Sequence, residues 1–162
     1  MISKKMQDAL NKQVNAEYYS SYLYLSMAAH FQAKNLNGLA HWMKKQSQEE
    51  LMHALKIFSF IDHCGGTVTL SAIDGPKTKW SSPVEVFKDT LAHEKKVTKM
   101  IHDLVDLAQK EKDRATEAFL IWFVNEQVEE ENTVEDILLK MEMLQDAPSG
   151  LFLMDRELGQ RQ

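Results

Sequence analysis

The sequence is poor in cysteine, proline and glycine. One cysteine, Cys64, stands alone in 162 residues, so an internal disulfide is excluded. Three prolines and six glycines leave room for long uninterrupted helices. Free cysteine is commonly buried, and Cys64 ends an apolar helical stripe, so we expect a small buried side chain at this position.

Long apolar runs and excess positive charge are also missing. The longest apolar run, residues 118–124, is far shorter than the ~18 residues that a membrane-spanning helix needs. The net charge of −5 gives no basic surface for nucleic acid or an anionic membrane, and it favours cationic partners. No apolar segment follows the first lysines as it does in a secretion signal. The sequence therefore predicts a cytoplasmic protein without nucleic-acid or membrane partners.

Helical periodicity dominates the rest of the chain. With 44% hydrophobic and 27% charged residues, the chain suits one domain over residues 1–162. In four segments the inward positions recur in alternating steps of four and three residues, which is the pattern of helices in a left-handed bundle. The four stripes are Met6, Leu10, Gln13, Glu17, Ser20, Tyr24, Met27, Phe31; Leu39, Met43, Gln46, Glu50, His53, Ile57, Phe60, Cys64; Phe87, Thr90, Glu94, Val97, Ile101, Leu104, Ala108; and Phe123, Gln127, Glu130, Val134, Ile137, Met141, Leu144.

Helix-start signals place these stripes on separate helices. The clearest start is at Ser82, a preferred capping residue, followed by Pro83 at the first helical position. Glu85 completes a Ser-x-x-Glu capping box there. The predicted helices cover about residues 4–33, 39–64, 83–109 and 114–145, so that the bundle occupies about residues 4–145, and a short fifth helix covers about residues 149–159.

Helix-stop signals predict how the helices connect. Gly65 and Gly66 favour the end of the second helix, and Pro148 and Gly150 are predicted to end the fourth. Residues 67–81 lack helical periodicity and reach about 50 Å when extended, whereas a helix of about 27 residues is roughly 40 Å long. One long crossover between two antiparallel hairpins is therefore expected.

Six polar residues interrupt the apolar stripes near the middle of each helix: Glu17, Glu50, His53, Glu94, Gln127 and Glu130. A buried carboxylate without a partner costs several kcal/mol, and a cluster of four adds mutual repulsion. The stripes contain no lysine or arginine, and four negative charges match two divalent cations. The sequence therefore predicts a buried two-metal centre at the waist of the bundle.

The spacing of the ligands indicates which metal the centre holds. Glu50 and His53 lie three residues apart, about 60° around a helix, so both can reach one ion. Gln127 and Glu130 repeat this spacing with an uncharged residue, so one position should bind less tightly. An oxygen-rich set with one histidine suits iron or manganese, and iron is our first expectation. Met52 lies between Glu50 and His53 and could suggest a methionine ligand to haem iron, but it points off the inward stripe, which argues against haem. A hydrogen-bond network without metal is the alternative.

Neighbouring residues leave two roles open. Tyr24 lies one heptad from Glu17, about 10 Å along the helix, where it is either a hydrogen-bond partner of the cluster or an ordinary core tyrosine. Glu49, Glu126 and Glu129 lie beside the ligands but about 100° around their helices, as isolated solvated charges would.

The residues together resemble bacterial non-haem ferritins over essentially the whole chain. The motifs that carry this resemblance are Asn15-Ala16-Glu17, Tyr24, Glu49-Glu50-Leu51-Met52-His53, His93-Glu94 and Asn125-Glu126-Gln127-Val128-Glu129-Glu130. The Gln-x-x-Glu spacing on the fourth helix argues against bacterioferritin and rubrerythrin-type enzymes. The resemblance implies an all-α, ferritin-like four-helix bundle with a short fifth C-terminal helix.

The resemblance also implies roles for the individual residues. One iron would be held by Glu17, Glu50 and His53, and the other by Glu50, Glu94 and Glu130, with Gln127 as a neighbouring polar group. Glu49, Glu126 and Glu129 would join Glu130 at an accessory third iron site. The substrates would be Fe(II) and dioxygen or hydrogen peroxide, and no haem is expected.

Ferritins of this kind form homo-oligomeric cages of 24 subunits that store ferric mineral. An apolar segment outside the main bundle agrees with assembly, because one subunit would not cover it: Leu151, Phe152, Leu153, Met154 and Leu158. Two other classes stay open. One is a di-iron or dimanganese oxygenase or peroxidase with an organic substrate, for which the large apolar residues of the stripes leave no evident room. The other is an iron-free helical assembly module.

Overall fold

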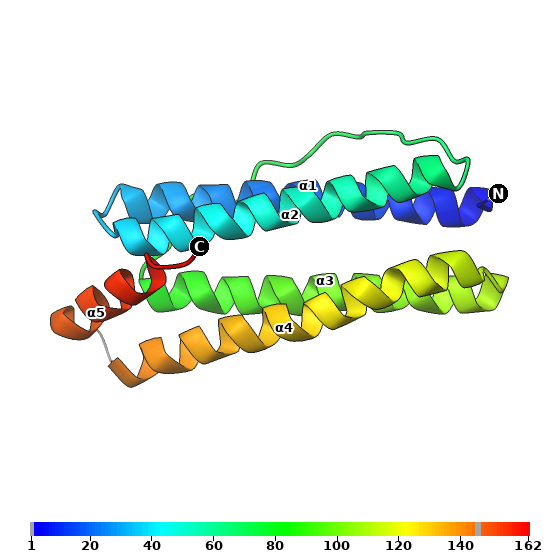
Figure 1. The fold of residues 1–162 in the computed structure, drawn as a ribbon. Helices are drawn as coiled ribbons and strands as arrows, with labels where there is room; N and C mark the ends of the chain where they lie inside the picture. Colours follow the sequence, from blue (N-terminus) through cyan, green and yellow to red (C-terminus); the bar gives the residue numbers. More distant parts are fainter. Residues whose placement is uncertain (1, 145–146) are drawn as a thin grey trace.

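The chain folds into a four-helix bundle with a fifth, shorter helix at one end (Figure 1). The computed structural model describes residues 2–144 and 147–162, and these contain five helices and no strand. The helices are α1 (Lys4–Gln32), α2 (Asn37–His63), α3 (Pro83–Glu111), α4 (Arg114–Leu144) and α5 (Pro148–Leu158). Within the described ranges, none of them is both long enough and apolar enough to cross a membrane. The predicted all-α bundle is confirmed.

Two helical hairpins, α1 with α2 and α3 with α4, lie side by side (Figure 1). The segment 64–82 joins them by running along the outside of the first hairpin from one end of the bundle to the other. Polar side chains of α1 hold this crossover: Asn11 Nδ2 donates to the carbonyl of Thr67 at 3.0 Å, and Ser26 Oγ donates to that of Lys77 at 2.7 Å. The long predicted crossover is therefore confirmed.

Capping residues fix the helix ends. Ser82 Oγ accepts the backbone N–H of Glu85 at 3.1 Å, and Pro83 opens α3. The Glu85 carboxylate accepts the N–H of Ser81 at 2.6 Å, one residue before the cap, so the reciprocal half of the predicted capping box is shifted. Gly65 ends α2 with a φ of 71°, a left-handed conformation that glycine adopts without steric cost.

Three sequence predictions are wrong in detail. Pro148 begins α5 instead of ending α4, since proline at a first helical position loses no hydrogen bond. The third helix continues to Glu111, where Lys112 takes the left-handed conformation that ends it. Cys64 is only half-buried, because it caps α2 beyond the last packed turn. The predicted end of the fourth helix at Gln145 lies outside the described residues.

The core consists of two apolar clusters separated by a polar layer. One cluster, on the side of α5, includes Tyr24, Phe31 and Phe87, and the other includes Leu10 and Ile57. Most buried polar positions fall between residues of the two clusters: Glu17 and Ser20 on α1; Gln46, Ser47, Glu50 and His53 on α2; Thr90 and Glu94 on α3; and Gln127 and Glu130 on α4. Gln13 lies one turn before Glu17, beside the cluster of Leu10, and Thr116 lies apart from the layer near the start of α4. The polar level predicted at the waist is confirmed.

Helix α5 crosses the end of the bundle and packs on the start of α2 (Figure 1). Asp155 Oδ1 accepts the backbone N–H of Leu39 at 2.9 Å, which supplies a capping bond from another helix. Met154 and Leu158 are buried against the core of the same chain, so the apolar segment is only partly uncovered, contrary to expectation. Phe152 and Leu153 remain 66% and 61% exposed.

Candidate metal centre

Six polar side chains meet at the waist. They are Glu17 from α1, Glu50 and His53 from α2, Glu94 from α3, and Gln127 and Glu130 from α4. None is more than 7% exposed. In the described chain no Cα atom of α2 lies within 8 Å of one from α4, and long polar side chains bridge the two helices at the waist, where Gln46 donates to Glu130.

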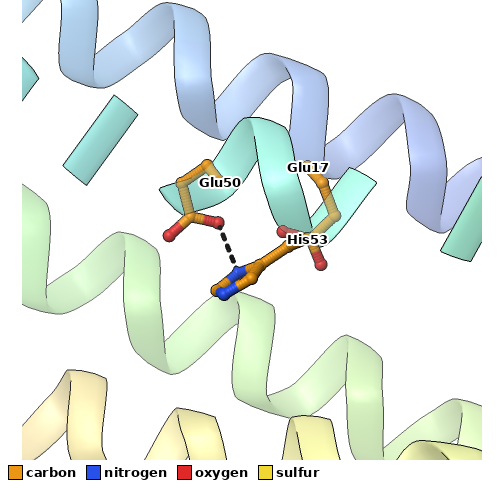
Figure 2. Close-up of side chains that lie close together, drawn as sticks. All are labelled: Glu17, Glu50 and His53. Atoms are coloured by element: carbon orange, nitrogen blue, oxygen red, sulfur yellow. Dashed lines mark hydrogen bonds and ion pairs between the residues drawn. The ribbon is translucent and has the colours of Figure 1, made fainter. Parts of the chain in front are cut away.

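The carboxylates and the histidine form two groups that share Glu50. Ligand atoms of Glu17, Glu50 and His53 lie within 4.8 Å of one another. Figure 2 shows the His53 ring turned toward the Glu50 carboxylate, with Nδ1 3.3 Å from Oε2. Atoms of Glu50, Glu94 and Glu130 form a second group within the same limit. Glu50 thus lies between two positions at which these side chains can converge on a cation.

Burial makes this layer unfavourable for negative charge alone. Burial first, then the neighbouring carboxylates, raises the pKa of Glu17 and of Glu50 well above the ordinary value. Burial also raises the pKa of Glu94, and burial with the charge of Glu94 raises the pKa of Glu130 to about 7. Glu17 Oε2 is buried and has no hydrogen-bond partner among residues 2–144 and 147–162. Cations between the carboxylates would remove these penalties, and the oxygen-rich set with one histidine fits iron or manganese.

Two glutamines orient the carboxylates from within the same stripes. Gln13 Nε2 donates to Glu17 Oε1 at 2.7 Å, and Gln46 Nε2 donates to Glu130 Oε2 at 2.7 Å. Gln46 Nε2 also lies 3.2 Å from Glu50 Oε1. The sequence indicated no role for these two glutamines beyond membership of a stripe. Their spacing could have indicated the role, since each precedes a predicted ligand by four residues, about one helical turn.

Glu94 has two further partners. The Tyr24 hydroxyl donates to Glu94 Oε1, and Gln127 Nε2 donates to Oε2 at 3.1 Å. Tyr24 is also fully buried. It is therefore both a hydrogen-bond partner of the cluster and a core residue, the two roles that the sequence left open. Gln127 presents its amide nitrogen to the centre, and this donor cannot ligate a metal. In this conformation Gln127 is therefore a neighbouring polar group.

The sequence predicted no room beside the centre, and this prediction is wrong, because the space lies outside the apolar stripes. A hollow of about 570 Å³ opens there, lined by Lys45, Gln48, Glu49, Met52, His53, Trp122, Glu126, Glu129, Glu130, Thr133, Arg161 and Gln162. Glu126 is half-buried, and its carboxylate lies within 4.8 Å of ligand atoms of His53 and Glu130. Glu49 and Glu129 are exposed on the wall and join no such group in the described part of the chain. The structure therefore brings Glu126 to the centre and leaves Glu49 and Glu129 farther out.

Comparison with known proteins identifies the family of the chain. Residues 7–144 match the ferritin family, described as a ferritin-like domain. The chain is 48% identical to the bacterial non-heme ferritin of Bacteroides fragilis over 161 residues, which cover 99% of this chain and 100% of that protein. The chain belongs to the ferritin family. The bacterial non-heme ferritin of Staphylococcus aureus is another ferritin relative, 38% identical over 99% of this chain and 97% of its own.

A solved ferritin structure matches the complete fold. The open pore ferritin from the hyperthermophilic archaeon Archaeoglobus fulgidus is 49% identical, with a TM-score of 0.99 over 100% of both chains. The chain therefore shares its complete fold, including the long crossover and α5, with that ferritin. The resemblance seen in the sequence motifs is confirmed.

Proposed function

We propose that this protein is an iron-storage ferritin. It oxidises Fe(II) to Fe(III) at the waist of each subunit and deposits ferric oxyhydroxide mineral inside a hollow cage of 24 identical subunits. The observation that carries this proposal is the buried layer in which two ligand groups share Glu50 within a ferritin-family bundle. Fe(II) is the substrate of the centre.

The ligand groups define a role for each residue. Glu17, Glu50 and His53 hold one Fe(II), while Glu50, Glu94 and Glu130 hold the other. The shared Glu50 keeps the two ions close together. Four carboxylates balance two divalent cations, and no lysine or arginine is among the buried residues of the layer. Tyr24 and Gln127 orient Glu94 through their hydrogen bonds.

The redox step balances with the substrates named. Two Fe(II) ions lose one electron each. With two protons, this electron pair reduces dioxygen to hydrogen peroxide, or hydrogen peroxide to two molecules of water. The protein contributes positioning, a suitable donor set and charge neutrality.

The hollow supplies a route away from the centre. Glu130 belongs to the buried group and also lies beside Glu126, so a cation can pass from one carboxylate set to the next. Glu126 and Glu130, which already lie close together, form the inner part of the accessory third iron site, and Glu49 and Glu129 on the wall of the hollow complete it when an ion binds. The uncharged Gln127 in place of a charged ligand weakens retention of Fe(III) and favours its exit toward the mineral.

Assembly rests on the apolar surface that the subunit leaves uncovered. Phe152 and Leu153 on α5 are exposed, as are Tyr22 and Leu25 on α1, at 50% and 49%. A monomer seldom exposes several large apolar side chains together, and a symmetric cage would cover them.

The test is aerobic Fe(II) addition, with oxygen uptake and retained iron measured per assembly. Storage predicts oxygen uptake and retention of many more irons than two per subunit. Retention that stops at two would favour the oxygenase or peroxidase, although the carboxylate-rich lining of the hollow suits cations better than an organic substrate. Glu50→Gln should abolish uptake, whereas Glu142→Gln, an exposed carboxylate elsewhere on α4, should behave as wild type. If the protein bound no iron, the iron-free helical assembly module would be the remaining interpretation.

A further inference from the structure

Arg161, which follows α5, lies folded against α2 at the edge of the hollow. Its Nη2 donates to Glu49 Oε2 at 2.5 Å, and its Nη1 donates to Gln46 Oε1 at 2.9 Å and to the carbonyl of Trp42 at 3.3 Å. The guanidinium carbon lies 4.4 Å from the centroid of the Trp42 ring, and the Arg161 carbonyl lies 2.6 Å from His41 Nε2. This side chain is therefore held in one position by several defined contacts, unlike an ordinary exposed arginine.

Arg161 also sets the orientation of Gln46. A guanidinium carries only donors, so it requires the oxygen of the Gln46 amide to face it. The amide nitrogen then faces the centre, where it donates to Glu130 at 2.7 Å and lies 3.2 Å from Glu50 Oε1. Arg161 thus acts on the centre through one intermediate side chain.

Glu130 lies at the boundary of two sets of ligands. Its carboxylate belongs to the buried group with Glu50 and Glu94, and also to the group with His53 and Glu126 on the wall of the hollow. The contact that Arg161 makes through Gln46 holds Glu130 on the buried side.

We propose that Arg161 is a displaceable internal cation. Its guanidinium pairs with the Glu49 carboxylate and, through Gln46, holds Glu130 toward the buried centre. When a metal ion in the hollow binds Glu49, the guanidinium is released. This inference rests on the proposed function, because it assumes that metal ions occupy both the waist and the hollow. Arg161 is a positioning residue that sets the balance between the two sets of ligands.

Exposure explains why Arg161 can be displaced. The Arg161 side chain is 20% exposed and that of Glu49 is 47% exposed, so water screens the ion pair on one side. Such pairs change an equilibrium by up to about fivefold, which a divalent cation with several carboxylate ligands can overcome.

Zn(II), which has no redox chemistry, tests the proposal in the assembled protein by titration against a chromogenic chelator. The wild type should show two tight sites per subunit and a weaker third. Arg161→Gln should tighten the third site by about two- to fivefold and weaken one of the two tight sites. Arg161→Lys keeps the charge that pairs with Glu49 but loses the second donor that orients Gln46. The third site should therefore keep its wild-type affinity, while the tight site stays weakened. Arg156→Gln removes the same charge from the exposed face of α5 and should change neither.

Opposite shifts at the two sites separate positioning from a simple loss of structure, which would weaken both. Arg161→Gln that leaves both affinities unchanged, or weakens both, would overturn the inference. Wild-type protein without two tight sites would instead contradict the proposed function, whatever Arg161 does. In a crystal structure with the third zinc bound, the guanidinium should have left Glu49, and a persisting contact would contradict displacement.

Discussion

Glu130 Oε2 accepts a hydrogen bond of 2.7 Å from Gln46 Nε2, and this bond joins α4 to α2 across the waist. The same carboxylate lies close enough to Glu94 for that charge to raise its pKa, in addition to the effect of burial. The arrangement that prepares Glu130 for a cation therefore makes the metal-free fold less stable once Glu130 ionises.

The first prediction concerns this pH dependence. The pKa of Glu130 rises from 4.5 to about 7 on folding, so the folded state holds the proton more tightly than the unfolded state. Its favourable contribution is complete below the unfolded pKa and is lost as the pH rises through about 7. Between about pH 5 and about pH 8, metal-free wild type should therefore lose about 1–3 kcal/mol of stability relative to Glu130→Gln. Denaturant unfolding at several pH values measures this difference, with the exposed neighbour Glu129→Gln as the control that follows wild type. Parallel curves for wild type and Glu130→Gln would refute it.

A second prediction separates the shared ligand from the unshared ones. Glu50 belongs to both ligand groups, whereas Glu17 belongs to one. Glu50→Gln should therefore remove both tight metal sites, and Glu17→Gln should remove one. Equilibrium dialysis with Zn(II) gives the number of ions bound per subunit, and equal losses in the two variants would show that Glu50 does not bridge.

A third prediction concerns Tyr24. Tyr24→Phe keeps the buried ring but removes the hydroxyl that donates to Glu94. We expect about 1 kcal/mol of lost stability, unchanged zinc stoichiometry and a slower first phase of Fe(II) oxidation, because Glu94 is less well oriented. Stopped-flow absorbance measures the rate. A variant as fast as wild type would limit the role of Tyr24 to packing.

A fourth prediction concerns release of product. Gln127→His supplies a metal ligand where the wild type has an amide, so it should hold Fe(III) longer. The first two irons per subunit should be oxidised normally, while later additions are oxidised more slowly than in wild type. Repeated additions of two Fe(II) per subunit test this prediction. If the variant turned over as fast as wild type, weak binding at Gln127 on α4 would not be the reason that Fe(III) leaves the centre.

A fifth prediction concerns the seat of α5. A Cβ atom at Gly38 would lie 1.6 Å from the backbone oxygen of Asp155, so Gly38→Ala must push α5 away from α2. We expect loss of the cage, seen by light scattering, and faster proteolysis of α5. Gly75→Ala, where a Cβ atom meets nothing within 4 Å, is the matched control. An intact cage in Gly38→Ala would show that assembly tolerates displacement of α5.

The bundle and its buried polar layer were predictable because both depend on local repeats. Stripes with steps of three and four residues place Glu17 and Glu94 inward, and capping residues such as Ser82 mark helix ends without knowledge of the neighbours. Mid-helix positions meet at one level whichever way each helix runs, so the buried layer also followed from the sequence.

The remaining features depend on contacts between distant parts of the chain. Arg161 and Glu49 are 112 positions apart, and no periodicity relates the end of α5 to the second helix. Pro148 serves equally well as a helix stop or a helix start, and only the packing of α5 decides between them. The burial of Met154 likewise follows from the place where α5 docks.

The most direct test is anomalous diffraction from crystals soaked with Fe(II) without oxygen. The proposed function predicts two iron peaks in every subunit, one bound by Glu17, Glu50 and His53 and the other by Glu50, Glu94 and Glu130. Absence of iron from this buried layer, or a single ion that does not contact Glu50, would contradict it.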